Sequence, residues 1–239
     1  MTVFLKSVEI QSDGFPIQDK FPFNIPSLGS PQRIDISAPV TFFVGQNGSG
    51  KSALMDALAR KCGFLPWGGS KTHRSHENPY ETALANHLSL EVDPHPPYGF
   101  HFRAEAFFNF ASSLDDVFMS DSDRRQFYGG ISLNVLSHGE SFLRFFGSYS
   151  FQLEGLYLLD EPEAALSPEN QVEFARMLLE GANKGNRQFI VATHSPIILG
   201  CPEAHILSFD DSPVRPITYR QTTHYAFYRD FLSNPEKFF

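Results

Sequence analysis

Apolar and polar residues alternate along the chain in patterns that predict a mixed α/β protein. Residues 52–61 carry apolar side chains at helical spacing, and residues 168–182 predict a second, longer helix. Short apolar runs that are typical of buried strands lie at 41–44, 156–160, 188–193 and 204–209. Strands and helices therefore alternate from about residue 153 to 210, which predicts an α/β core.

The N-terminal part, up to about residue 43, predicts the strands of an antiparallel sheet. Its strand-like segments are VFLKSVEIQ, FPFNIP and RIDISAPVTFFVG, the last of which contains the first core strand. Prolines at 16, 22, 26, 31 and 39 fit the edges and turns of an antiparallel sheet rather than the centre of a parallel one.

The middle of the chain predicts a subdomain inserted at about residues 84–150. The stretches SLEVD and GFHFRAEAFFNF alternate as strands do, and residues 112–128 predict short helices. Residues 63–82, rich in Gly, Ser and His, predict a mobile loop, and the tail HYAFYRDFLSNPEKFF predicts a short amphipathic helix. We therefore expect one domain over residues 1–239.

Composition and charge narrow the class of protein. The hydrophobic share is 41%, and the 25 phenylalanines suggest aromatic-rich sheet packing, with some at a partner surface. No apolar run approaches the roughly 18 residues of a membrane helix, no signal peptide is evident, and Cys62 and Cys201 form no C-x-x-C pair. We therefore expect a cytoplasmic protein with reduced thiols. The net charge of −8 disfavours a chain that binds nucleic acid by itself, so any nucleic-acid contact would be indirect.

A phosphate-binding loop follows the first core strand. Residues 45–52 match G-x-x-x-x-G-K-[ST] in full, between a strand and a helix. Such a loop curls its backbone N–H groups around phosphate oxygens, while Lys51 reaches the β- and γ-phosphates and Ser52 ligates Mg²⁺. The sequence therefore predicts a site for ATP and Mg²⁺ formed by Gly45, Gln46, Asn47, Gly48, Ser49, Gly50, Lys51 and Ser52.

Two further strand ends carry residues that suit phosphoryl transfer. Asp160 and Glu161 end the apolar run of LYLLDEPEAALSP, where Asp160 would help to hold Mg²⁺ and Glu161 would polarise the attacking water. An apolar run followed by Asp-Glu is common by itself, and the phosphate loop makes it specific. His194 ends another run in IVATHSP, although a single histidine at a strand end is usually a hydrogen-bonded surface residue.

The segment VLSHGES, residues 135–141, is called the signature segment below. Ser137 and Glu140 would form a capping box at a helix N-terminus, which is the ordinary interpretation of this pattern. The same helix start also presents hydroxyl and N–H groups that can bind an anion. The sequence by itself leaves both interpretations open.

Together the four segments resemble those of the ATP-binding cassette (ABC) ATPases, over residues 36–210. They are most similar to the non-transporter, SMC-like branch of chromosome-maintenance and DNA-repair ATPases. Within it they resemble small stand-alone bacterial AAA-family ATPases that share the segments DEPEAALSP and ATHSP. The resemblance implies a P-loop NTPase with an ABC-type head, an N-terminal antiparallel β part and a small inserted helical subdomain.

The resemblance also implies roles for individual residues. Ser137, Gly139 and Glu140 would belong to the signature segment that completes the γ-phosphate site of a second chain, so that two chains enclose two ATP molecules. Glu161 would be the catalytic base, and His194 would sense the γ-phosphate. Residues 165–167 would form the dimer-contacting loop.

Some positions depart from the family pattern. His138 stands where transporter subunits have glycine, and the segment between Ser52 and Leu136 is too short for a long coiled coil. No glutamine loop is evident, and Glu105 or Arg103 is the best substitute. Phe15 or Phe23 would stack on adenine, but the sequence selects neither.

Other candidates have ordinary explanations. His73 and His76 could form half of a metal site but are more typical of a solvated loop. Arg124 and Arg125 are more typical of a solvated helix face than of a nucleic-acid contact. Glu163 would line the dimer interface or cap the following turn.

Three functions fit these observations. The first is a dimeric ATP-hydrolysing switch that controls a partner effector in DNA maintenance or anti-phage defence. The second is the nucleotide-binding subunit of a membrane transporter, which would need a glutamine loop. The third is a binding module that ATP assembles with little hydrolysis, which the retained Glu161 disfavours.

Overall fold

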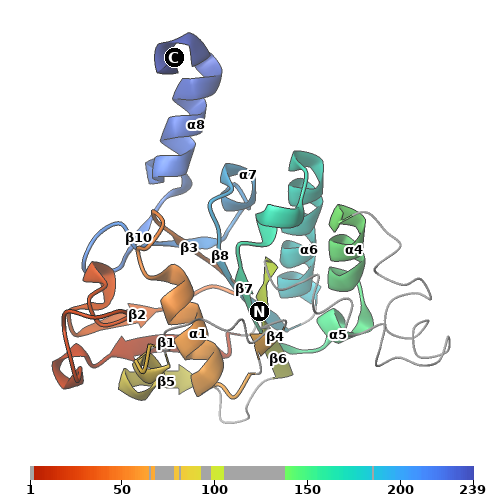
Figure 1. Ribbon diagram of the computed structural model, residues 1–239. Helices are drawn as coiled ribbons and strands as arrows, with labels where there is room; N and C mark the ends of the chain where they lie inside the picture. The colour runs from red at the N-terminus through yellow and green to blue at the C-terminus, as the bar shows by residue number, and fades with distance from the viewer. Residues whose placement is uncertain are drawn as a thin grey trace.

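The computed structural model describes residues 3–64, 66–67, 78–80, 82–92, 98–104, 138–184 and 186–239. Within these residues the strands form two sheets, which helices flank (Figure 1). The predicted α/β fold is confirmed. The predicted helices at 112–128, together with Glu105, Ser137, His73 and His76, lie outside the described residues.

The core sheet has the strand order β10-β9-β3-β8-β7-β6-β4. All its neighbouring strands are parallel except β10 and β9, which are antiparallel. The strands span β3 Val40–Val44, β4 Pro66–Trp67, β6 Tyr98–Arg103, β7 Gly155–Asp160, β8 Arg187–Ala192, β9 His205–Ser208 and β10 Arg215–Ile217. Since β3, β7, β8 and β9 run in one direction, their carboxyl ends meet at one edge of the sheet.

Helices cover both faces of the core sheet. Successive residues of a strand point to opposite faces, and the buried strands of this sheet carry apolar side chains on both. On one face Phe42, Tyr157 and Phe189 join a core that includes residues of α4, α6 and α7. On the other, Phe43 and Leu158 join a core with α1 and the N-terminal sheet. The helices span α1 Lys51–Lys61, α4 His138–Phe146, α5 Tyr149–Gln152, α6 Pro168–Lys184, α7 Pro196–Leu199 and α8 Thr223–Ser233. Short 3₁₀ helices span η1 Ser12–Gly14, η2 Pro26–Leu28, η3 Ala83–His87, η6 Pro162–Ala165, η7 Tyr219–Gln221 and η8 Pro235–Phe238.

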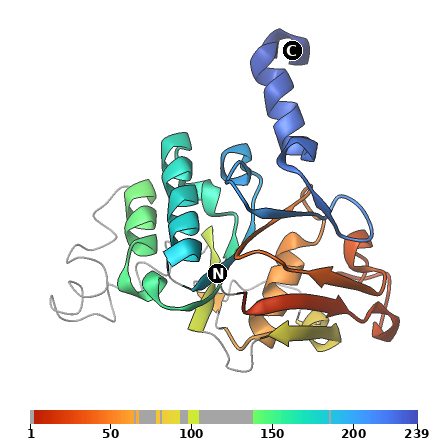
Figure 2. The ribbon, with the colours of Figure 1, turned by 180° about the vertical axis from the view of Figure 1, so that it is seen from behind.

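The second sheet is antiparallel, as the N-terminal prolines predict. Its order is β2-β1-β5, with bounds β1 Leu5–Ile10, β2 Gln32–Asp35 and β5 Leu88–Val92 (Figure 2). The buried Gln188 of β8 joins the two sheets: its Oε1 accepts from Leu5 N at 2.8 Å, and its Nε2 donates to Leu5 O at 2.9 Å.

Two local expectations are corrected by the structure. The segment 21–26, expected as a strand, forms turns that lead into η2. The reason is that Pro22 and Pro26 lack N–H donors, and that the N–H groups of Phe23 and Asn24 donate to Lys20 O within turns rather than to a neighbouring strand. Within the expected loop 63–82, β4 pairs with β6 in the core sheet.

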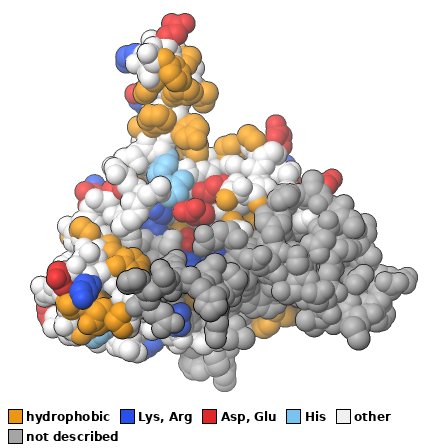
Figure 3. All heavy atoms as spheres, in the orientation of Figure 1, with side chains coloured by type: hydrophobic (Ala, Val, Ile, Leu, Met, Phe, Trp, Pro, Cys, Tyr) orange, Lys and Arg blue, Asp and Glu red, His pale blue; other side chains and the backbone are white. Residues whose placement is uncertain are grey.

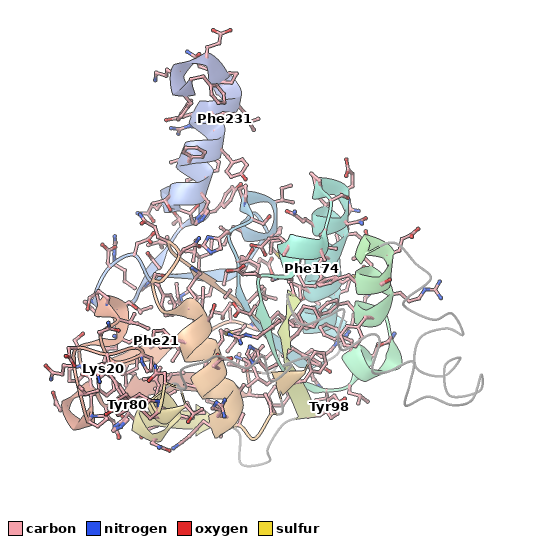
Figure 4. The ribbon with its side chains drawn as sticks, in the orientation of Figure 1. Lys20, Phe21, Tyr80, Tyr98, Phe174 and Phe231 are labelled. Atoms are coloured by element: carbon pink, nitrogen blue, oxygen red, sulfur yellow. The ribbon has the colours of Figure 1, made fainter. Side chains whose placement is uncertain are left out.

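Phenylalanines fill the space between the sheet and helices α4 and α6. Phe146 has ring contacts with Phe142, Phe151 and Phe174, at centroid distances of 4.5, 4.2 and 5.0 Å. Phe174 of α6 is labelled in Figure 4. This cluster confirms the aromatic-rich packing that the composition suggests.

Helix α8 projects from the body of the molecule, as Figures 1 and 2 show. Phe227, Tyr228 and Leu232 are exposed on it, and Phe231, labelled in Figure 4, lies near its outer end. No helix in the described part of the chain is both long and apolar enough to cross a membrane.

Candidate active site

The residues that the sequence predicts for nucleotide binding and catalysis lie at the carboxyl edge of the core sheet. The phosphate loop follows β3, Asp160 ends β7, and His194 lies two residues beyond β8. In Figure 3 acidic and histidine side chains gather on this face below the projecting α8. Parallel strands thus bring together segments that the sequence separates by more than a hundred residues.

The phosphate loop bends through positive φ angles that favour glycine. Gly48 has φ +78° and Gly50, the N-cap residue of α1, has φ +104°. A Cβ at Gly50 would lie 2.8 Å from Ile25 Cγ2, so a larger residue there would be strained and would force Ile25 to shift. Ser27 Oγ donates to Ser49 O at 2.5 Å and holds the loop against η2.

Lys51 is buried, and its side chain folds back under the start of the phosphate loop. Its Nζ donates to Gly45 O at 2.7 Å and to Gln46 O at 3.0 Å. Burial lowers the pKa of Lys51, although Glu161 and Asp160 oppose this shift. The Gln46 N–H donates at 2.7 Å to Asp210, a residue just beyond β9 that no sequence motif identifies.

Ser52 and Asp160 form an oxygen-rich pair that fits Mg²⁺. Ser52 Oγ donates to Asp160 Oδ1 at 3.1 Å, and Arg103 Nε lies 3.7 Å from Asp160 Oδ2. Burial raises the pKa of Asp160 to about 6. Mg²⁺ takes few protein ligands and keeps several waters or phosphate oxygens, so one hydroxyl and one carboxylate suffice. A cavity of about 310 Å³ adjoins the pair and is lined by Ser52, Arg103, Ala104, Asp160, Glu161, Ala164 and Ala165.

Arg103, one of the two expected substitutes for the glutamine loop, lies at this cavity. Its Nη2 is 3.0 Å from Asp56 Oδ2 of α1, so it bridges α1 and the end of β7. The sequence indicates Arg103 only by its place at the end of a strand.

Glu161 adopts a backbone conformation that is unusual for its residue type. Its φ and ψ are 51° and 50°, in the left-handed region, and its N–H donates to Ala192 O at 2.9 Å. Such conformations cost of order 1–3 kcal/mol and cluster at functional sites. The side chain is half exposed, so its carboxylate is accessible from the cavity.

Glu163 joins the residues that follow β7 to Thr193 and His194, which follow β8. Its Oε2 accepts from Thr193 Oγ1 at 2.8 Å, and its Oε1 accepts from His194 N at 2.5 Å. Burial raises the pKa of Glu163. The sequence leaves the role of Glu163 open between a dimer interface and a turn cap. The structure shows instead that its two hydrogen bonds fix His194 relative to Glu161.

His194 lies between Glu161 and a second histidine. Its Nε2 is 3.6 Å from Glu161 Oε1, and its Nδ1 is 3.0 Å from Nε2 of His224 in α8. Burial and the nearby Lys51 lower the pKa of His194 to about 4, so the ring is neutral at pH 7. His224 belongs to no motif, and nothing in the tail sequence predicts this contact.

Of the signature segment the structure describes residues 138–141, none of which lines this cavity, although Gly139 packs against the cavity residue Ala165. Gly139 is packed so closely beneath α6 that a Cβ would lie 2.7 Å from Asn170 Nδ2 and 3.4 Å from Ala165 O. Glu140 is exposed in the first turn of α4. Of the two candidates for adenine stacking, Phe23 is buried against Phe15 and cannot offer its face to a base.

Comparisons with known proteins agree with this geometry. Residues 93–200 match the family described as "AAA domain, putative AbiEii toxin, Type IV TA system", and residues 23–82 match one described as "AAA domain". A search of curated proteins gave no match to this sequence.

Solved structures share the fold at low sequence identity. The SMC head domain from Thermotoga maritima is 20% identical, with a TM-score of 0.52 over 90% of this chain and 99% of that one. An SMC head bound to the C-winged helix domain of ScpA is 15% identical, with a TM-score of 0.53 over 90% and 98%. CbiO1 from Clostridium perfringens, part of the ABC transporter complex cbiONQ, is 15% identical, with a TM-score of 0.51 over 96% of each chain.

The chain therefore has the P-loop NTPase fold that SMC heads and ABC ATPase cassettes share. This confirms the resemblance inferred from the four sequence segments.

Proposed function

We propose that this chain is a Mg²⁺-dependent ATPase that acts as an ATP-driven dimerising switch on a partner effector. The observation that carries the proposal is the contact between Ser52 and Asp160 beside Glu161. A hydroxyl after the phosphate loop, a buried carboxylate and an accessible carboxylate are the protein groups that ATP hydrolysis requires.

Each residue would have a distinct task. The N–H groups of the loop and Lys51 would bind the phosphates, and Ser52 and Asp160 would hold Mg²⁺. When bound, Mg²⁺ supplies positive charge against the phosphate oxygens. Glu161 would orient the attacking water, and His194, 3.6 Å away, would donate a hydrogen bond to the γ-phosphate.

The dimer would complete the site. Gly139 and Glu140 do not line the cavity around Ser52 and Asp160 in their own chain. Gly139 instead packs beside Ala165, in the segment that the family resemblance places at the contact with a second chain. This position fits the arrangement that the resemblance implies, in which the signature segment of one chain completes the site of the other. Hydrolysis would then be slow in a monomer, because part of the transition-state stabilisation comes from the second chain.

A protein effector is the partner that the comparisons support. One structural relative is an SMC head bound to the C-winged helix domain of ScpA. The family that matches residues 93–200 is described with a toxin of a type IV toxin–antitoxin system. These likenesses support a cytoplasmic switch in DNA maintenance or anti-phage defence.

Phosphate release from Mg-ATP tests the proposed activity. The wild-type chain should hydrolyse ATP, Lys51→Ala should not, and Glu161→Gln should be slower by about 10²–10⁴-fold. Glu173→Gln is a matched control because Glu173 is an exposed residue of α6 that pairs with Arg176. Equal rates for Glu161→Gln and Glu173→Gln would contradict the role of Glu161, and no wild-type turnover would favour ATP-driven assembly.

The partner is tested by capture of Glu161→Gln from its own cells with Mg-ATP present, followed by mass spectrometry. A soluble effector would support the switch. A membrane protein would favour the transporter function instead.

A further inference from the structure

The contact between His194 and His224 joins the candidate active site to α8. Their rings lie with centroids 5.0 Å apart, and His194 Nδ1 is 3.0 Å from His224 Nε2. The two outer nitrogens, His194 Nε2 and His224 Nδ1, are buried and make no hydrogen bond in the described structure. His194 Nε2 faces Glu161 Oε1 at 3.6 Å.

Both rings are neutral near pH 7. Burial, followed by the charge of Lys51, lowers the pKa of His194 to about 4 and also lowers the pKa of His224. A neutral imidazole carries one N–H and one acceptor nitrogen, so one of the two rings must donate across the 3.0 Å contact.

The two donor assignments differ in the group that His194 Nε2 presents to Glu161. If His194 donates, its Nε2 presents a lone pair to the Glu161 carboxylate, and His224 is left with a buried N–H that has no described partner. If His224 donates, His194 carries its proton on Nε2, facing Glu161. The acceptor Nδ1 of His224 then has no described partner, and the Nε2–H of His194 lies 3.6 Å from Glu161 Oε1 without forming a hydrogen bond. Each assignment leaves one N–H and one acceptor nitrogen without a hydrogen bond, so the side chain that faces the pair decides between them. The Glu161 carboxylate repels a lone pair on His194 Nε2 and attracts an N–H there, which favours the second assignment.

We propose that His224 donates its Nε2–H to His194 Nδ1 and thereby holds His194 as the tautomer that carries its proton on Nε2. This inference rests on the proposed function. The hydrogen bond makes His224 a positioning residue for ATP hydrolysis. His194 then presents an N–H, rather than a lone pair, to the γ-phosphate.

Residues of η7 and of the first turn of α8 hold His224 in place. Tyr219 OH donates to Pro196 O at 2.9 Å, and the rings of Tyr219 and Tyr225 lie 4.8 Å apart. Thr222 caps the helix by accepting from Tyr225 N at 3.2 Å. His224 therefore belongs to the anchored first turn, while the exposed Leu232 lies farther along the projecting part.

Nitrogen-15 NMR of the histidine rings in the nucleotide-free protein tests the proposal without any catalysis. His194 should show a protonated Nε2 and an unprotonated, hydrogen-bonded Nδ1, and His224 should show a protonated Nε2. In His224→Leu the hydrogen-bond shift of His194 Nδ1 should disappear, whereas His224→Gln, whose amide can donate, should retain it. A protonated Nδ1 on His194 in the wild type, or an Nδ1 shift that His224→Leu leaves unchanged, would overturn the proposal.

Steady-state hydrolysis supplies the second readout. His224→Leu should lower kcat about threefold to tenfold, the size of one lost hydrogen bond, with KM for Mg-ATP unchanged, and His224→Gln should restore most of it. His205→Leu and His205→Gln are matched controls, because His205 also contacts a side chain, Ser37, but starts β9 at the opposite edge of the sheet. Equal loss in both His224 variants would indicate a merely structural role and contradict the proposal. If the wild type shows no turnover, the proposed function fails while the NMR result still decides the role of His224.

Discussion

Ser52 Oγ donates a hydrogen bond to Asp160 Oδ1 over 3.1 Å, although 108 positions separate the two residues in the sequence. The bond joins the first turn of α1 to the end of β7. It exists because β7 runs parallel to β8, which in turn runs parallel to β3, so that the ends of the strands meet at one edge. The magnesium site that we propose is therefore a property of the sheet topology.

Ser52→Ala and Asp160→Asn should each weaken the binding of Mg-ATP at least about tenfold, while ATP binding in EDTA changes little. The double variant should be only slightly weaker than either single one, because both residues would hold the same ion. A fluorescent ATP analogue titrated with and without Mg²⁺ measures all three. Additive losses, or equal losses in EDTA, would show that the pair does not bind the metal.

Glu163→Ala should lower the free energy of unfolding by about 1–3 kcal/mol, because it leaves Thr193 Oγ1 and His194 N without their shared acceptor. The free energy of unfolding of Glu163→Gln should lie between those of Glu163→Ala and the wild type, since the amide keeps one acceptor oxygen. Urea unfolding measures both, and Glu173→Ala, on an exposed face of α6, is the control. An unchanged midpoint for Glu163→Ala would mean that these hydrogen bonds do not contribute to stability.

Phe146→Ala should destabilise the fold by about 3–5 kcal/mol, because Phe146 is buried among the rings that join α4, α6 and the sheet. The same substitution at Phe227 of α8, which is 55% exposed, should change the stability of the monomer by no more than about 0.5 kcal/mol. Chemical denaturation of the two variants compares them directly. Similar losses at both positions would contradict the assignment of the core.

The elements that the sequence predicts best are those whose local pattern leaves little choice. The run before Asp160 is apolar at every position, as a parallel strand buried on both faces requires, and the structure has β7 at Gly155–Asp160. The phosphate loop is equally predictable because each of its glycines meets a geometric need, as the positive φ of Gly50 shows.

What the sequence could not predict depends on contacts between distant residues. Phe23 and Ile25 look like strand residues, but they are buried under turns rather than in a sheet. His224 lies in an amphipathic tail, where a histidine carries no motif, and only the packing of η7 and α8 against α7 brings it to His194. Glu163 follows the acidic pair, but its partners come from the end of another strand.

The mass of Glu161→Gln with Mg-ATP, measured by light scattering after gel filtration, tests the central claim most directly. Retained ATP should hold two chains together, so the measured mass should rise to twice the 26.9 kDa of the single chain. The double variant Lys51→Ala with Glu161→Gln, and Glu161→Gln with ADP, should both stay at the mass of one chain. A Glu161→Gln protein that is saturated with Mg-ATP and still runs at 26.9 kDa would contradict the ATP-driven dimer.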